Sequence, residues 1–314
     1  MALIKPMEPL LSKTIKENPA FLHQIKWDGV RGITYIDHGT YKVFTKKGHE
    51  RTGFYPELDA ITTLFNGKSG VIDGELIVLD EGSKPSFNRI LNRERVRTTH
   101  KIAYYSQKYP VKYIVFDIMF LDGQDLRPYP TEKRMDLLHQ TLSKSSSITL
   151  TDSFDDGHQL YALMKDKNYE GIVSKKRNSP YIGGKKHNDW FKTKIFKKML
   201  TVIGGIKYDG DRIKSLLLGI YDEDALIYIG NASIGLTEAD MQLIKEYTHA
   251  LKAEKCPFYP IMKDKDTLWV QPLLTCWVSF LEWTDGASLR HPKIIGFSSE
   301  KSMTATGKEY TYNG

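Results

Sequence analysis

The sequence predicts an α+β fold divided into two domains, and three observations support this prediction. The chain has 314 residues, a length that accommodates two domains. Up to about Leu200, strand-like apolar patterns alternate with helix-like ones. Beyond Leu200, strand-like segments separated by aspartate-containing turns predominate. We therefore expect a boundary near residues 197–201, with domains at 1–198 and 199–314.

The composition is that of a globular protein that folds without disulfides or structural metals. Hydrophobic residues make up 40% of the chain and charged residues 26%. No run of about 18 apolar residues is present, and residues 1–19 lack the apolar stretch of a signal peptide. The two cysteines, Cys256 and Cys276, are not spaced as metal ligands. These features predict a reduced, cytoplasmic protein with no membrane span.

Positive charge is concentrated in one segment of the chain. The net charge is +7, which favours a polyanionic partner. Within Ser174–Lys198, Asp189 is the only acidic residue. Aromatic residues are interleaved with the cations at positions Tyr181, Trp190, Phe191 and Phe196. Because a solvated charged face more often alternates signs, this segment is predicted to contact a nucleotide or a nucleic acid.

The first domain is expected to combine strands with flanking helices. Predicted strands cover Gln24–Lys26, Gly32–Ile36, Tyr41–Thr45, Val71–Leu79, Val111–Leu121, Gly171–Lys175 and Trp190–Ile195. Predicted helices cover Pro56–Phe65, a segment capped by Ser86 and running towards Arg95, a segment beginning at Thr131, and Gly157–Lys165. The nearly continuous apolar run from Val111 to Leu121 indicates a strand buried on both faces.

The second domain is predicted to be a small β-barrel. Its strand-like segments are Thr201–Lys207, Ser215–Tyr221, Leu226–Gly230 and Leu273–Trp283. Thr237 and Asp240 fit a capping box that opens one helix, which reaches about Lys252. A barrel of five strands with one helix fits this span, and the OB fold is the candidate architecture.

A candidate nucleophile lies in the segment Lys26–Arg31, which reads Lys-Trp-Asp-Gly-Val-Arg. Alone, its aspartate-glycine pair predicts only a hairpin turn. The unusual feature is Lys26 on an apolar strand, because burying a lysine that has neither a partner nor a function is unfavourable. Desolvation and nearby cations lower the pKa of a lysine, and the neutral amine is a nucleophile.

Further segments supply groups that suit nucleotidyl transfer. Glu75 and Glu170 are carboxylates that can hold a divalent metal or ribose hydroxyls. Lys192 and Lys194 fall on one face of a predicted strand, where a phosphate would relieve their mutual repulsion. Phe116 can stack on a base. Each pattern alone fits solvated edge charges or core packing, but together they describe a lysine that attacks the α-phosphorus of a nucleoside triphosphate.

The order and spacing of these segments resemble the covalent nucleotidyltransferases, namely ATP-dependent DNA ligases, RNA ligases and mRNA capping enzymes. The family motifs match Lys26–Arg31, Asp73–Glu75, Phe116-Asp117, Glu170–Lys175, Lys192–Lys194 and Arg290–Lys293. Within that superfamily the chain looks most like compact bacterial and phage ATP-dependent DNA ligases, including the ligase module of bacterial end-joining enzymes. The segments Tyr55–Leu58, Val115–Gly123 and Leu281–Pro292 carry this closer likeness.

The resemblance implies an ATP-grasp-like adenylation domain with antiparallel sheets and flanking helices, followed by an OB-fold domain. It implies that Lys26 attacks ATP and becomes a lysyl-AMP, while Glu75 and Glu170 hold Mg²⁺ or Mn²⁺. The implied nucleotide contacts are Gln24, Ile25, Arg31, Glu75, Phe116, Lys192 and Lys194. Lys46 is an implied contact to DNA, and Arg290 and Lys293 would orient pyrophosphate. The implied partner is nicked double-stranded DNA, bound by a monomer.

Two residues depart from the family pattern. Such ligases usually carry glutamate two residues before the lysine, where Gln24 stands here. Glutamine both accepts and donates hydrogen bonds, which weakens the argument for strict ATP selectivity. An arginine is usual where this chain has Lys46, and lysine keeps the charge but lacks the two-pronged geometry of a guanidinium.

Other functions remain as alternatives. An RNA ligase or a capping guanylyltransferase would share the fold and Lys26, and Gln24 leaves this open. A non-enzymatic OB-type nucleic-acid binder would be expected to have lost Lys26 or a metal carboxylate, and neither is lost. Replication, nick repair, end joining and phage DNA metabolism all use ligase chemistry. An end-joining ligase could act with a partner such as Ku, but no docking motif is evident.

Overall fold

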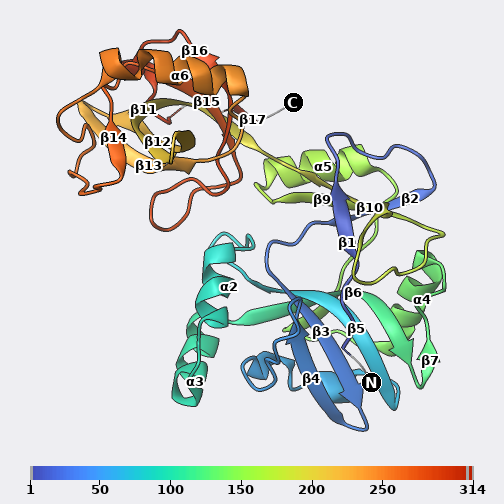
Figure 1. Cartoon of the computed structure of the whole chain (residues 1–314). Helices are drawn as coiled ribbons and strands as arrows, with labels where there is room; N and C mark the ends of the chain where they lie inside the picture. The colour runs from blue at the N-terminus through green and yellow to red at the C-terminus, as the bar shows by residue number, and fades with distance from the viewer. Residues whose placement is uncertain (1–2, 309–310, 313–314) are drawn as a thin grey trace. The chain divides into compact units, whose positions relative to one another are not determined.

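The computed structural model describes residues 3–308 and 311–312. The chain divides into two compact units, of which the first ends at Lys194 and the second begins at Ile195 (Figure 1). This division falls where β10 (Lys186–Lys194) ends and just before β11 (Lys197–Asp209) begins. Among the described residues, no helix is both long enough and apolar enough to cross a membrane.

The first unit contains a four-stranded sheet in the order β1-β10-β9-β2. Its other strands are β1 (Glu8–Leu11), β2 (Phe21–Ile25) and β9 (Gly171–Lys176). β9 pairs antiparallel with both β2 and β10, whereas β1 pairs parallel with β10. The sheet therefore joins segments from both ends of the first unit, and it places the candidate nucleophile beside the cationic segment.

The same unit contains a six-stranded sheet in the order β4-β3-β5-β6-β7, with β8 parallel to β6. Its strands are β3 (Val30–Asp37), β4 (Thr40–Thr45), β5 (Ser69–Val78), β6 (Val111–Leu121), β7 (Gln124–Asp125) and β8 (Ile148–Leu150). We expected antiparallel sheets, and the parallel pairs β1–β10 and β6–β8 correct this: both sheets are mixed.

Helices flank these sheets. α2 (Phe87–Glu94) packs on β5, α4 (Thr131–Thr141) packs on β6, and α5 (Gly157–Asp166) packs on β2 and β9. The helix predicted over Pro56–Phe65 is instead divided into η1 (Pro56–Leu58) and α1 (Ile61–Leu64). α3 (Thr99–Lys108) was not predicted, because it buries none of its residues and so lacks an apolar period.

The first unit has two clusters of buried apolar residues. The larger fills the space between the six-stranded sheet and its helices, with Tyr113, Ile118 and Leu138 fully covered. The smaller combines Ile33, Val71 and Met119 of the six-stranded sheet with Met7 and Trp190 of the other sheet region. This smaller cluster holds the two sheets together and so fixes the groups that they present to the space between them.

The second unit is built on one sheet in the order β13-β12-β11-β15-β16, with β14 and β17 also paired to β11. The strands are β12 (Arg212–Asp222), β13 (Ala225–Ala232), β14 (Thr267–Trp269), β15 (Thr275–Phe280), β16 (Lys293–Ser298) and β17 (Thr311–Tyr312). A short η2 (Ser302–Thr304) precedes β17. The strands β14, β16 and β17 were not predicted, because short or half-exposed strands give weak alternation.

The closed barrel that we expected is not seen among the residues described, since no strand ladder joins β13 to β16. Two backbone hydrogen bonds nevertheless connect these ends. Leu289 N donates to Ile229 O at 2.7 Å, and Ile294 N donates to Ile234 O at 2.9 Å.

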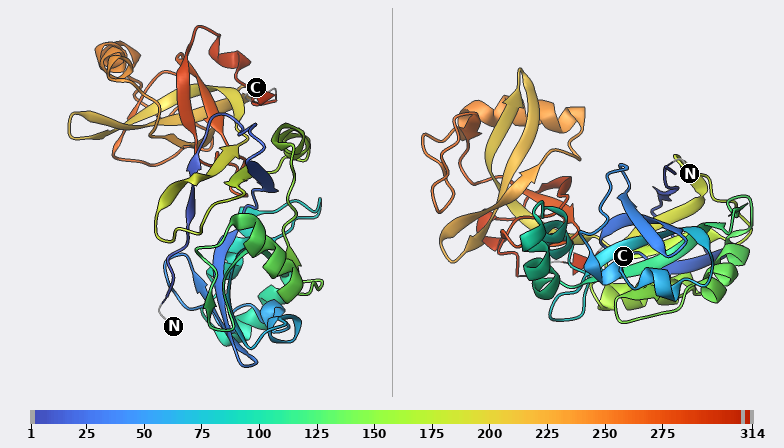
Figure 2. Two further views of the ribbon diagram at one scale, coloured as in Figure 1. Left: turned by 90° about the vertical axis from the view of Figure 1, so that its right-hand side faces the viewer. Right: turned by 90° about the horizontal axis from the view of Figure 1, so that it is seen from below.

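A long helix of the second unit, α6 (Glu238–Leu251), lies beside the strands in both views of Figure 2. Its N-terminus is the capping box that the sequence predicted. Thr237 Oγ1 accepts from Asp240 N at 3.1 Å, and the Asp240 carboxylate accepts from Thr237 N at 2.8 Å.

Candidate active site

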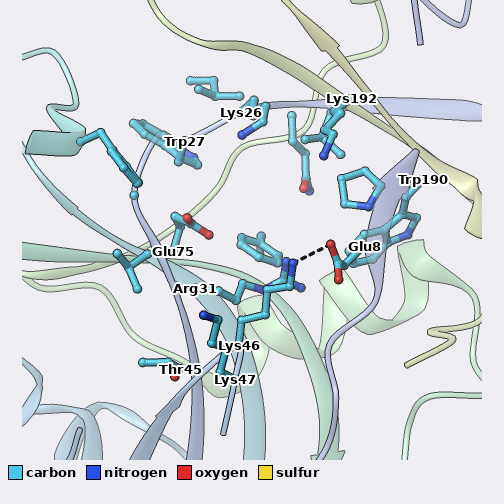
Figure 3. A pocket seen from close by; sticks show the side chains of 18 of the residues that line it. Glu8, Lys26, Trp27, Arg31, Thr45, Lys46, Lys47, Glu75, Trp190 and Lys192 are labelled. Carbon is cyan, nitrogen blue, oxygen red and sulfur yellow. Dashed lines mark hydrogen bonds and ion pairs between the residues drawn. The ribbon is translucent and has the colours of Figure 1, made fainter. Parts of the chain in front are cut away.

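A cavity of about 670 Å³ opens between the two sheets of the first unit. The four-stranded sheet contributes Gln24, Ile25, Lys175 and Lys192, among others. The six-stranded sheet contributes Val30, Arg31, Glu75 and Phe116, and α2 closes one side with Phe87, Leu91 and Glu94. The remaining lining residues come mainly from the segments around Glu8 and Lys46. Figure 3 shows Lys26 and Lys192 pointing into this cavity from the same side. A cavity of this size accommodates a nucleotide.

Lys26 stands directly after β2, where its backbone N donates to Gly171 O at 2.9 Å. Its ammonium donates to Glu170 Oε2 at 2.5 Å, and Lys194 Nζ lies 2.7 Å from Glu170 Oε1. The Glu170 side chain is only 5% exposed. Burial alone would raise the pKa of Glu170, but Lys26 and Lys194 lower it to about 2. Glu170 is therefore an ionised carboxylate that forms ion pairs with two lysines.

Gly171 makes this close approach possible. Its φ of +140° is unfavourable for residues with a side chain. A Cβ at this position would lie 2.1 Å from Thr193 O on β10. The glycine therefore lets β9 and β10 meet closely enough for Glu170 to reach Lys194.

Lys192 is the second cation of the cavity that the sequence singled out, and it differs from Lys194. No ion pair engages it within the described part of the chain. Burial lowers the pKa of Lys192, and repulsion from Lys26 and Lys194 lowers it further. Three ammonium groups thus gather around one paired carboxylate, Glu170. An excess of positive charge in a partly buried cavity favours an anionic ligand such as a phosphate.

Glu75 lines the cavity from β5 and makes no hydrogen bond or ion pair with any residue in the described ranges. Burial raises the pKa of Glu75 to about 7, although Arg31 and Lys26 oppose this shift. An unpaired carboxyl group that faces a cavity is available to a ligand or a cation.

Arg31 is held by two residues, Asp73 and Tyr181, to which the sequence analysis gave no such role. Its guanidinium makes a two-pronged ion pair with Asp73, which is fully buried. Tyr181 donates to the same carboxylate at 2.6 Å and accepts from Met7 N at 3.0 Å. The Arg31 guanidinium also lies 4.7 Å from the centre of the Phe116 ring. Asp73 and Tyr181 therefore fix the position of Arg31 over that ring.

Lys175 is a cavity residue to which the sequence analysis gave no role. Its ammonium donates to Phe116 O at 3.1 Å and lies 4.1 Å from the Trp190 ring centre. Its side chain is 2% exposed, and burial lowers the pKa of Lys175 to about 7, while Asp117 opposes the shift. Its position as the last residue of the motif Glu170–Lys175 was the signal that could have identified it.

Gln24 is buried at the cavity wall. Its Nε2 donates to Ser153 Oγ at 3.1 Å, while no residue of the described ranges donates to its Oε1. The amide oxygen is thus the atom left to accept a hydrogen bond from a ligand. Ile25, the next residue, contributes an apolar surface to the same wall.

Three of the expected site residues lie outside this constellation. Lys46 is at the rim of the cavity, and its ammonium lies 2.7 Å from Glu8 Oε2 (Figure 3). Arg290 and Lys293 lie in the second unit. Arg290 pairs there with Glu282 at 2.7 Å, and Lys293 is exposed at the start of β16.

The carboxylates fit a cation that shares its coordination with a substrate. Among residues 3–308, no three His, Cys, Asp or Glu side chains are grouped as a protein-only metal centre. Mg²⁺ usually takes one or two carboxylates, and the rest of its ligands are water and phosphate oxygens. Glu75, which is unpaired, and the neighbouring Glu170 supply this type of donor set.

The fold and the site define a nucleotide-binding protein whose cavity presents a clamped lysine. Family models identify the class more closely. The model of the ATP dependent DNA ligase domain matches residues 2–194, and that of the ATP dependent DNA ligase C terminal region matches residues 209–301. The chain belongs to the family of ATP-dependent DNA ligases.

Individual relatives agree with this membership. The multifunctional non-homologous end joining protein LigD of Mycobacterium bovis is 31% identical over 292 residues, covering 90% of this chain and 37% of its own length. A DNA ligase of Archaeoglobus fulgidus is 25% identical over 312 residues, covering 93% of this chain and 54% of its own. The chain thus spans between about a third and a half of the length of such relatives.

The solved structures give the same result. The ligase domain of Mycobacterium tuberculosis LigD matches with a TM-score of 0.55 at 27% identity, and the match covers 98% of each chain. A mycobacterial DNA ligase D complexed with ATP and MES matches with the same score and coverage. A Lig E DNA ligase, at 15% identity and a TM-score of 0.60, shares the fold and covers 93% of this chain and 99% of its own.

Proposed function

We propose that this chain seals nicks in duplex DNA with ATP, by way of an AMP group carried on Lys26. The main support is the pair of ion pairs that Glu170 makes with Lys26 and Lys194, beside Lys192, which has no ion pair among the described residues. It puts a lysine nucleophile among cations at a cavity of nucleotide size.

In the first step, the Lys26 ammonium, which Glu170 holds, releases a proton to solvent, and the resulting amine forms a bond to the α-phosphorus of ATP. The nitrogen releases a second proton to solvent as this bond forms. The bond from that phosphorus to the bridging oxygen breaks, and pyrophosphate leaves with the electron pair. Lys192 and Lys194 stabilise the charge that develops on the phosphate oxygens. The product is a phosphoramide between Lys26 and AMP.

The remaining groups of the cavity orient the nucleotide. Phe116 stacks on the adenine, and Gln24 Oε1 accepts from its amino group. Ile25 packs against the nucleotide. Arg31 and Glu75 hold the ribose and phosphate. Because Arg31 lies over the Phe116 ring in this structure, adenine and guanidinium must share or exchange that surface.

Glu75 and Glu170 are the residues that would hold Mg²⁺ or Mn²⁺, together with phosphate oxygens. The cation would withdraw electron density from the phosphates and so assist the departure of pyrophosphate. Glu75 is the readier ligand, because Glu170 already serves two ammonium groups.

The second unit is proposed to be an OB-type barrel, with the adenylation domain at residues 1–198 and the barrel at 199–314. Support comes from the backbone hydrogen bonds that connect the ends of its sheet, Leu289 to Ile229 and Ile294 to Ile234. Arg290 and Lys293 would orient pyrophosphate in the first step, and the barrel would then close on DNA. Lys46 would contact the DNA.

In the later steps, AMP moves from Lys26 to the 5′-phosphate of the nick. The 3′-hydroxyl then bonds to that phosphorus and releases AMP. We propose that the protein acts as a monomer. We also propose that it works in a reducing compartment, the cytoplasm, because Cys256 and Cys276 are both free thiols. End joining with Ku is one setting for this chemistry, alongside replication, nick repair and phage DNA metabolism.

The test is an adenylation assay with α-labelled ATP and Mg²⁺, resolved on a denaturing gel. We expect a label on the wild-type protein and none on Lys26→Ala. Lys144→Ala, which changes an exposed lysine that does not line the cavity, should label normally. A Lys26→Ala protein that keeps the label would rule out this nucleophile.

Gln24 bears on one alternative, an RNA ligase or capping-type guanylyltransferase, because its amide would donate to the carbonyl of a guanine if Nε2 turned from Ser153 towards the cavity. Parallel assays with ATP, GTP and NAD as donors, and nicked DNA or RNA ends as acceptors, separate these functions. Nick sealing with ATP alone supports the DNA ligase. Labelling by GTP would support the alternative.

A further inference from the structure

The helices α2 and α3, residues 86–108, form a hairpin with an unusual charge. From residue 95 to residue 116 the chain contains no acidic residue. The cations of this stretch are Arg95, Arg97, Lys101, Lys108 and Lys112. We call residues 86–108 the α2–α3 hairpin. In Figure 1 its two helices follow one another along the margin of the first unit.

α3 exposes a stripe in which cations flank an aromatic ring. Lys101, Tyr104 and Lys108 are three and four positions apart, so they share one face of the helix. All three are exposed, and Tyr104 is 57% exposed. None of the residues of α3 is buried. Helices of globular proteins usually gain stability by burying an apolar face, which α3 does not do.

The exposed cations of the hairpin are not neutralised within residues 3–308. Arg95 and Lys101 make no ion pair there. Lys108 contacts neighbouring tyrosines, with its ammonium 5.4 Å from the ring centre of Tyr109 and 5.7 Å from that of Tyr104. Arg97 donates to the backbone carbonyl of Glu94 at 2.6 Å. Their positive charge is therefore available to an external anion.

The hairpin is nevertheless firmly mounted beside the active site. The Arg93 side chain is 1% exposed; it pairs with Glu57 and donates to Tyr109 O at 2.8 Å and to Phe54 O at 3.0 Å. On another side of α2, Phe87 and Leu91 line the nucleotide cavity. The cations thus begin at the wall of the cavity and extend away from it.

We propose that the α2–α3 hairpin binds the phosphate backbone of the substrate duplex next to the nick. This inference rests on the proposed function. A helix of ten residues is about 15 Å long, and duplex DNA carries one charge per roughly 1.7 Å, so about nine phosphate charges lie along that length. Lysines that contact phosphates gain affinity by releasing counterions, and they read no sequence. The hairpin therefore anchors the enzyme on DNA independently of base sequence.

The test compares two double variants of the full chain. Lys101→Gln/Lys108→Gln removes the stripe, and Lys144→Gln/Lys167→Gln removes two exposed lysines elsewhere in the first unit. Binding is measured on a nicked duplex with a 3′-dideoxy end, which cannot be sealed. We expect the stripe variant to bind about tenfold more weakly at physiological salt and to lower the slope of log K against log salt by about 2. The control should match the wild type.

Two further measurements locate the effect. Formation of lysyl-AMP without DNA should be equal in all three proteins, because neither pair of lysines touches the cavity. Shortening the duplex on one side of the nick should weaken the wild type and abolish its advantage over the stripe variant. If wild type and stripe variant bind every duplex equally, the hairpin is not a DNA contact. If the wild type itself forms no lysyl-AMP, the proposed function fails instead.

Discussion

Glu75 lines the cavity, whereas Glu170 does not line it and contacts Lys26, and the surroundings of these two carboxylates shift their pKa values in opposite directions. Glu170 is contacted by two ammonium groups, and its pKa falls to about 2. Glu75 is buried without such a contact, and its pKa rises to about 7. Two carboxylates whose pKa values differ in this way can serve different roles in one site. Glu170 holds Lys26 and Lys194 in place, and Glu75 remains available to a ligand.

The shift at Glu75 predicts a measurable pH dependence of stability. A folded-state pKa above the ordinary value of 4.5 means that the folded protein keeps a proton that the unfolded chain releases between pH 4.5 and 7. The free energy of unfolding contributed by Glu75 therefore falls as pH rises through this window. Glu75→Gln removes the effect. Relative to wild type, it should gain about 1–3 kcal/mol between pH 5 and pH 8 in urea unfolding.

The comparison with the variant is essential because Lys175 titrates near the same pH with the opposite sign. Its folded pKa of about 7 is below the ordinary 10.5, so its contribution to stability rises with pH above 7. Glu170 stays ionised at both values of pH. A difference between wild type and Glu75→Gln that is the same at pH 5 and pH 8 would contradict the raised pKa.

The sequence motifs identified Lys26, Glu75, Phe116 and Lys192, and the structure places all four at one cavity. The motifs did not identify the residues that hold these side chains in position. Asp73 and Tyr181 are 108 positions apart, and only the fold reveals that both hold Arg31. A buried tyrosine that accepts from one backbone and donates to one carboxylate has no signature in the linear sequence.

At the scale of secondary structure, prediction depended on how much of an element is buried. β6 was predicted with both ends correct, because it is a buried strand with an almost unbroken apolar run. α3 was missed because none of its residues is buried, so its sequence lacks an apolar period. The helix expected over Pro56–Phe65 is divided because Asp59 and Ala60 separate a 3₁₀ turn from one α-helical turn.

The mounting of the α2–α3 hairpin leads to a prediction about Arg93. Replacing Arg93 with methionine leaves Glu57 partly buried without its cation, and Glu57 also accepts from Val111 N at 3.0 Å. We expect Arg93→Met to lower the free energy of unfolding by about 3–5 kcal/mol. Arg95→Met, at an exposed neighbour, should change it by less than about 0.5 kcal/mol.

Hydrogen exchange of the amides of α3 provides a second measurement. Arg93 joins α2 to the carbonyl of Tyr109, directly after α3. Its loss should therefore accelerate exchange in α3 more than in β6, which has its own buried contacts. Equal unfolding energies for Arg93→Met and Arg95→Met would mean that the buried ion pair does not hold the hairpin.

At the scale of the whole molecule, each unit has a core of its own. The buried apolar clusters of the first unit contain residues up to Trp190, and those of the second begin at Met199. All residues that line the nucleotide cavity belong to the first unit. The proposed contribution of the second unit can therefore be tested by substituting residues of that unit, none of which lines the cavity.

Arg290 is the residue that tests this contribution. If it orients pyrophosphate, Arg290→Ala should slow the formation of lysyl-AMP by a factor on the order of 10 to 100, because a cation on the departing phosphates is lost. Sealing of a nick that already carries AMP on its 5′-phosphate needs no pyrophosphate, so its rate should be unchanged. Arg212→Ala, at an exposed arginine of the same unit, should leave both rates unaffected.

The local partner of Arg290 makes a second variant necessary. Arg290 pairs with Glu282, so truncation to alanine also removes this local ion pair. Arg290→Lys keeps the charge and should recover part of the rate of lysyl-AMP formation. Equal losses in both steps would show instead that Arg290 maintains the second unit or binds DNA. A selective loss in the first step, partly restored by lysine, is the pattern that only a role in pyrophosphate orientation produces.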